Sequence, residues 1–113
     1  MATRLKNVDE IVSADHGSGA KTTVLDYTPV AANTGAIDLS AGNNFTVAGG
    51  TGTLSFSNTA DHIGQSGNIY VTGGASIDTN SVISKGDITG DHWVSYFVVN
   101  ATHAVISIGE DLS

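Results

Sequence analysis

Three of the four histidines directly follow an aspartate, and these pairs are the side chains best suited to hold a metal ion. They are Asp15-His16, Asp61-His62 and Asp91-His92. Carboxylate and imidazole groups together bind zinc and similar cations. A compact site favours two ligands at close, regular spacing within one element, and these pairs lack that spacing. They fall instead in predicted turns. His62 and His92 are the better candidate ligands, but we expect no metal site and no cofactor.

Catalytic arrangements are also missing from the sequence. It contains no Gly-x-Ser-x-Gly elbow and neither of the glycine-rich phosphate-binding motifs. Adjacent carboxylates occur at Asp9-Glu10 and Glu110-Asp111. A pair of catalytic carboxylates must converge in a cleft, whereas neighbouring acidic residues near the ends of a chain usually face solvent. We therefore expect a protein that is not an enzyme.

The charge balance excludes several classes of partner. Eleven acidic and four basic residues give a net charge of -7, so the surface should repel nucleic acids and anionic membranes. The sequence has no cysteine, and no apolar run approaches the ~20 residues of a membrane span. No apolar segment typical of a secretion signal follows Met1. We expect a protein that is made and kept in the cytosol or that leaves the cell by lysis.

The composition and periodicity indicate short strands. Of the 113 residues, 47 are Gly, Thr, Ser or Asn, and only 13% are charged. From residue 36 onward apolar and polar residues alternate, which is typical of strands with one buried face. Glycine pairs at 49–50 and 73–74 predict hairpin turns. The sequence therefore predicts an all-β fold, an antiparallel β-sandwich or jelly-roll-like domain. Its predicted core is Ile37, Leu39, Phe45, Val47, Leu54, Phe56, Ile69, Val71 and Phe97.

The segment 92–99 departs from this alternation because it is apolar on both faces. Trp93, Phe97 and Val99 point one way, and Val94, Tyr96 and Val98 point the other way. A strand of this kind is either covered on both sides by its own chain or contributes one face to a subunit interface. We favour the interface and assign to it Trp93, Val94, Tyr96 and Val98.

Residues 1–20 differ from the remainder, which forms a single predicted domain over 21–113. Apolar residues near the start have nearly helical spacing but also suit an extended segment, and two of the four basic residues lie among them. A frayed terminus is the simpler reading. We interpret the segment as an N-terminal arm that binds a partner through Arg4, Leu5, Lys6, Val8, Ile11 and Val12.

Four sequence pieces between residues 37 and 108 resemble a β-rich module of tailed-phage virion proteins. They are Asp38–Phe45 (DLSAGNNF), Thr53–Asn58 (TLSFSN), Gly64–Val71 (GQSGNIYV) and Val94–Val99 (VSYFVV). Their order and spacing are similar to those of tail-fibre-like domains and small capsid proteins. The pieces cover about two-thirds of the chain but specify only alternation and turns. They contain no active-site residue of the family that could be assigned to a position in this chain.

The resemblance implies a structural component of the virion. A short β-domain with an arm is similar to capsid decoration (cement) proteins, which typically form trimers on the outside of the shell. The expected partners are therefore further copies of the chain and the major capsid protein. The alternative is a tail-fibre or tail-tip component that binds a host receptor or glycan, for which Tyr27 and Tyr70 are possible platforms.

Overall fold

The computed structural model describes residues 28–50 and 52–113, and these residues form an all-β fold. The predicted arm at 1–20 lies outside the described residues. The elements are β1 (Val30–Ala31), β2 (Ala36–Asp38), β3 (Asn44–Val47), β4 (Thr53–Ser57), the short 3₁₀ helix η1 (Thr59–Asp61), β5 (Ser66–Val71), β6 (Ser76–Ile77), β7 (Val82–Ile83), β8 (His92–Val98) and β9 (Ala104–Asp111). No described helix is long and apolar enough to cross a membrane.

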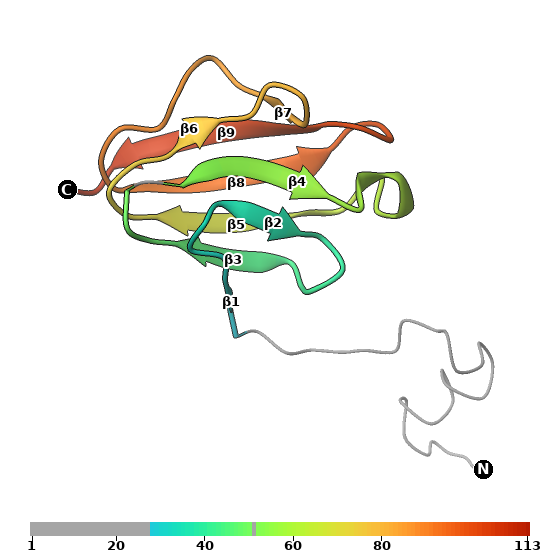
Figure 1. The fold of residues 1–113 in the computed structure, drawn as a ribbon, viewed down its shortest axis with the longest axis horizontal. Coiled ribbons are helices and arrows are strands. Elements are labelled where there is room, and N and C mark those ends of the chain that lie inside the picture. The colour runs from blue at the N-terminus through green and yellow to red at the C-terminus, as the bar shows by residue number, and fades with distance from the viewer. Residues whose placement is uncertain (1–27, 51) are drawn as a thin grey trace, which may run out of the picture.

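The strands form two sheets that face each other across one core. The larger sheet has the order β1-β3-β5-β8-β9-β7, and the smaller has the order β2-β4-β6 (Figure 1). From β1 to β6 the chain alternates between the sheets, and from β3 onward each of these strands pairs in parallel with the strand numbered two lower. This winding resembles a β-solenoid. The antiparallel β8–β9 pair then extends the larger sheet beside β5.

The predicted strand direction therefore needs correction. Among the strands of the described residues, β5–β8 and β8–β9 are antiparallel, whereas β1–β3, β2–β4, β3–β5, β4–β6 and β7–β9 are parallel. Outside the strands, Ala75 and Ile88 form one antiparallel bridge. The glycine pairs at 49–50 and 73–74 do not close hairpins, because the strands on either side of each pair belong to different sheets. A jelly roll, which is built from antiparallel strands, does not describe this arrangement.

The two glycine pairs occupy equivalent corners of successive coils. Asn44 pairs with Asn68 and Val47 with Val71, so the repeat in β3 and β5 is 24 residues long. Gly49 and Gly73 are separated by the same interval and both have positive φ. A side chain at Gly50 would lie 2.9 Å from the carbonyl oxygen of Gly73, so the corners stack too closely for a larger residue.

The core confirms the predicted alternation along 37–71. Ile37, Leu39, Phe45, Val47, Leu54, Phe56, Ile69 and Val71 are all buried. The assignment of Phe97 to the predicted core is wrong, because 47% of its surface is exposed. Strand β8 instead contributes Val94, Tyr96 and Val98, which alternate with the exposed Trp93, Ser95 and Phe97.

A small polar network holds Tyr96 in this core. Its hydroxyl donates to the carbonyl oxygen of Asn43 at 2.8 Å and accepts from Nε2 of Gln65 at 3.1 Å. The same amide group donates to the carbonyl oxygen of Gly42 at 2.9 Å. Burial raises the pKa of the Tyr96 hydroxyl, which remains a neutral donor. The network fastens the loop between β2 and β3 to β8 and to Gln65, which directly precedes β5.

Candidate interaction face on the larger sheet

The face of the larger sheet that points away from the core carries a band without ionisable acids or bases. Strand register places its residues in three rows that run across the strands. The first row is Ala31, Thr46, Tyr70 and Trp93; the second is Asn44, Asn68, Ser95 and Ser107; the third is Ser66, Phe97, Val105 and Ile83. The register of β8 and β9 shifts between His92, which lies opposite Asp111, and Val94, which lies opposite Ile108, so the acidic Glu110 and Asp111 lie at this irregularity, at the Trp93 end of the band. We call these three rows the outer face.

The third row is largely apolar. Phe97 lies opposite Val105, and Val105 lies beside Ile83 on the next strand. Phe97 is 47% exposed and Ile83 is 46% exposed, while Val105 is partly buried. We call these three residues the Phe97 cluster. Exposed large apolar side chains that adjoin one another are typical of surfaces that contact another protein.

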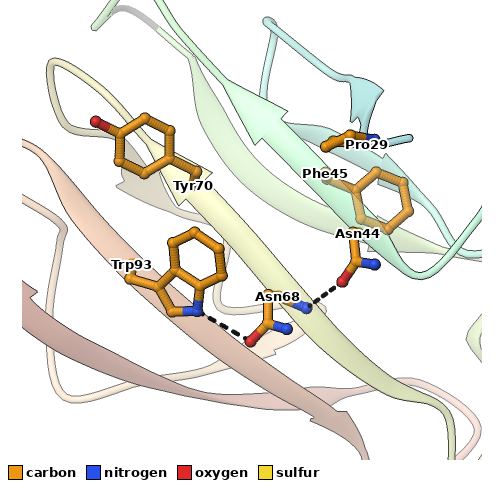
Figure 2. Close-up of a pocket in the computed structure, with 6 residues that line it drawn as sticks. All are labelled: Pro29, Asn44, Phe45, Asn68, Tyr70 and Trp93. Carbon is orange, nitrogen blue, oxygen red and sulfur yellow. Dashed lines mark hydrogen bonds between the residues drawn. The ribbon is translucent and has the colours of Figure 1, made fainter. Parts of the chain in front are cut away.

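The first row presents a different chemistry, because its aromatic rings adjoin amide groups. Trp93 is 50% exposed, and its ring centroid lies 6.1 Å from that of Tyr70. The indole Nε1 donates to Oδ1 of Asn68 at 3.1 Å, and the backbone N–H of Asn68 donates to Oδ1 of Asn44 at 3.3 Å (Figure 2). An open cavity of about 220 Å³ lies here, lined by Pro29, Asn44, Phe45, Asn68, Tyr70 and Trp93.

The hydrogen bonds fix the orientation of both amide groups in this cavity. The indole N–H and the backbone N–H can only donate, so the atoms that accept from them must be oxygens. The Nδ2 groups of Asn44 and Asn68 therefore occupy the opposite positions. Neither Nδ2 donates to another residue in the described part of the chain. Within residues 28–50 and 52–113, two amide donors on neighbouring strands thus have no protein acceptor.

These positions correct the predicted self-interface. Val94 and Val98 have no exposed surface and Tyr96 is 3% exposed, because all three pack between the two sheets of their own chain. They leave no area for a second copy to contact. Trp93 does lie on the surface. Ser95 is the signal in the sequence that indicates this orientation. It lies on the same side of the strand as Trp93 and Phe97, and a serine there marks that side as the solvated one.

Sequence reasoning missed several residues of the outer face. Ile83 and Val105 come from strands that are distant in the sequence, and only the pairing of β7 with β9 places them beside Phe97. Asn44 and Asn68 become neighbours through the parallel pairing of β3 and β5. A 24-residue comparison of the chain with itself would have aligned these two asparagines.

The candidate metal ligands lie in separate places. Nε2 of His62 is 3.3 Å from the hydroxyl of Ser40, whereas both ring nitrogens of His92 lie 2.8 Å from backbone carbonyl oxygens, those of Gly109 and Thr89. Among the described residues no three His, Cys, Asp or Glu side chains gather as a metal site would require. Asp15 and His16 lie outside the described residues.

His92 holds the carboxyl end of β9 against the loop before β8. A neutral imidazole can donate from one nitrogen only, whereas the protonated ring can donate to both carbonyl oxygens. The hydrogen bond to Gly109 is the main cause that raises the pKa of His92, and the nearby Asp111 carboxylate contributes. Hydrogen bonds from Ser113 in turn lower the pKa of Asp111.

Comparisons with known proteins give no relative for this chain. No family model matches the sequence, no curated protein matches it, and no solved structure matches the fold.

Proposed function

We propose that the protein is a structural subunit of a tailed-phage virion, most simply a capsid decoration (cement) protein. In this proposal residues 21–113 form one domain that assembles as a homo-oligomer, such as a trimer, on the outside of the shell. The oligomer contacts the major capsid protein and stabilises the shell by binding only its assembled form. The observation that supports this proposal best is the uncharged outer face with the exposed Phe97 cluster.

The outer face suits contact with a second copy for an electrostatic reason. Each chain carries a net charge of -7, so two copies repel each other over most of their surfaces. Along its three rows the outer face lacks acidic and basic side chains, and it offers apolar area at Phe97, Ile83 and Val105. A second copy that meets this face buries apolar surface without bringing like charges together. The Phe97 cluster is therefore the proposed self-interface, whereas Trp93 lies at the opposite end of the outer face.

The proposed contact with the shell uses the arm. Arg4 and Lys6 complement an acidic surface, and Leu5, Val8, Ile11 and Val12 supply apolar contacts. An arm that orders on docking can cover a wide surface, at a cost in conformational entropy. Deletion of residues 2–20 should therefore abolish cosedimentation with capsids and leave a folded oligomer. Normal binding of the truncated protein to capsids would refute this role for the arm.

The oligomer is tested by measuring mass in solution. Analytical ultracentrifugation should find a homo-oligomer for the natural protein and a monomer for Phe97→Asp, because the substitution places a charge at the centre of the proposed contact. Ile63→Asp is the matched control, since Ile63 is 57% exposed but lies before β5 and outside the outer face. Both variants should keep the natural circular dichroism spectrum. A folded Phe97→Asp protein of unchanged mass would refute the proposed interface.

A tail-fibre or tail-tip component remains the second proposed role. The exposure of Trp93 and the amide groups beside it favour this alternative, because exposed aromatic rings are the usual platforms for sugars. The number of copies in a virion separates the two roles. A shell component follows the capsid lattice in copy number, whereas a tail component occurs in far fewer copies.

A further inference from the structure

The cavity beside Trp93 combines a partly exposed aromatic pair with two amide donors. We propose that it binds one neutral sugar ring, a pyranose at the end of a glycan or a free monosaccharide. Trp93 and Tyr70 supply the stacking surface, and Asn44 and Asn68 supply the hydrogen bonds. This site needs neither a shell nor a second copy, so it does not rest on the proposed assembly.

The aromatic pair fits the apolar side of such a ligand. The rings of Trp93 and Tyr70 are tilted by 39° to each other, with centroids 6.1 Å apart, and come from neighbouring strands of a rigid sheet. The hydrogen bond from the indole Nε1 to Asn68 fixes the position of the Trp93 ring (Figure 2). A ring that is held in place loses little entropy when a ligand packs against it. The C–H groups on one side of a pyranose supply such a packing surface.

The amide groups fit the polar side of the ligand. The Nδ2 groups of Asn44 and Asn68 point away from the oxygens that accept the bonds from N–H groups. The two residues are register partners on adjacent parallel strands, which lie about 4.8 Å apart. Hydroxyl and acetamido oxygens of a sugar can accept hydrogen bonds from such donors. The same ligand can thus contact the aromatic pair and the amides together.

The charge and size of the cavity decide which ligands fit. None of its lining residues carries an acid or a basic group, and the chain as a whole is acidic, so a neutral ligand is favoured over a phosphate or an acidic sugar. The volume of about 220 Å³ is below the ~300–1,000 Å³ of sites for larger ligands. A proline-rich peptide extends by about 3.1 Å per residue and needs a longer groove. One sugar ring is the better match.

The proposed site and the proposed self-interface occupy opposite ends of the outer face. Trp93 and Phe97 are four residues apart on β8, which corresponds to about 13 Å along a strand. The site includes Asn44 and Asn68 of the second row, and on β8 Ser95, which lies opposite Asn68, separates Trp93 from Phe97. Failure of sugar binding therefore leaves the mass measurement unaffected, and failure of self-association leaves the sugar titration interpretable.

The chain contains a natural reporter for the test, because Trp93 is its only tryptophan. Intrinsic fluorescence is recorded while the protein is titrated with methyl glycosides of glucose, galactose and mannose and with N-acetylglucosamine and N-acetylgalactosamine. We expect a saturable change in emission with at least one of these sugars. No response to any of them at their highest soluble concentrations overturns the proposal, as does stronger binding of a proline-rich peptide at the same site.

Variants separate a specific site from nonspecific quenching. Asn68→Ala and Asn44→Ala should each weaken the binding roughly tenfold, which corresponds to the loss of about one good hydrogen bond. Trp93→Ala, followed by nuclear magnetic resonance of the sugar protons, should remove detectable binding. Ile63→Ser, an exposed apolar position elsewhere on the surface, should bind as the natural protein does. Equal affinity in all four variants overturns the proposal.

Discussion

Replacement of Tyr96 by phenylalanine removes one hydroxyl from the core and leaves the ring in place. The ring keeps its contacts with Phe45 and Phe56, whose centroids lie 6.4 and 5.3 Å away. Two hydrogen bonds are lost, the one that the hydroxyl donates to Asn43 and the one that it accepts from Gln65. The substitution therefore tests the hydrogen-bond network that fastens the β2–β3 loop, without changing the packing of the Tyr96 ring.

The expected cost follows from what each partner loses. A neutral hydrogen bond contributes about 0.5–1.5 kcal/mol net, so the two together contribute about 1–3 kcal/mol. Gln65 keeps its bond to Gly42, and Asn43 is an exposed residue whose carbonyl group can reach water. Neither partner is left fully buried without a bond. We therefore expect Tyr96→Phe to lower the free energy of unfolding by about 1–2 kcal/mol.

Urea denaturation followed by circular dichroism measures this change. Tyr70→Phe is the matched control, because Tyr70 points outward and its hydroxyl makes no hydrogen bond to another described residue. Its free energy of unfolding should stay within about 0.5 kcal/mol of the natural value. An unchanged stability for Tyr96→Phe would refute the network. A change in oligomer mass without a change in stability would show that Tyr96 belongs to an interface after all.

Two further predictions concern the same framework. Gly67→Ala should destabilise the fold by about 3 kcal/mol in the same assay, because the added methyl group would overlap the Asn43 carbonyl and lie 2.9 Å from the Tyr96 hydroxyl. His92 has a raised pKa in the folded protein, so its stabilising effect is complete below the unfolded-state value of ~6.5 and is lost as pH rises through the folded value. The melting temperature of the natural protein should therefore fall relative to that of His92→Gln as pH is raised from about 6 to 8, and parallel curves would contradict this.

The core could be predicted from the sequence because alternation does not depend on strand direction. A strand with one buried face has a period of two in parallel and antiparallel sheets alike. Phe45 and Val47, or Leu54 and Phe56, are therefore recognisable without any knowledge of their partners. The all-β class follows from the same pattern together with the glycine-rich turns.

Strand direction could not be predicted, because a glycine pair at a corner looks the same in a hairpin and in a coil. The glycine pairs at 49–50 and 73–74 follow β3 and β5, which pair in parallel, and each leads into the smaller sheet. The informative signal is the 24-residue interval between them, which also separates Asn44 from Asn68. Interval and register together indicate a coil, whereas each turn by itself indicates a hairpin.

The residues of the outer face could be predicted only in part from the sequence. Both sides of β8 hold large apolar residues, so hydrophobicity alone does not tell which side is buried. Burial in the structure depends on the smaller sheet, which covers Val94 and Tyr96 and leaves Trp93 and Phe97 exposed. Which side of β8 is buried therefore depends on contacts between segments that are far apart in the chain.

Hydroxyl-radical footprinting of the assembled protein tests the central claim that the Phe97 cluster of the outer face is the self-interface. Oxidation of individual side chains is compared between a concentrated, oligomeric sample and a dilute sample. The account predicts that Phe97 becomes protected on assembly, while Ile63, which has similar exposure in the single chain, is oxidised at the same rate in both. Unchanged oxidation of Phe97, or equal protection of Ile63, would contradict the account.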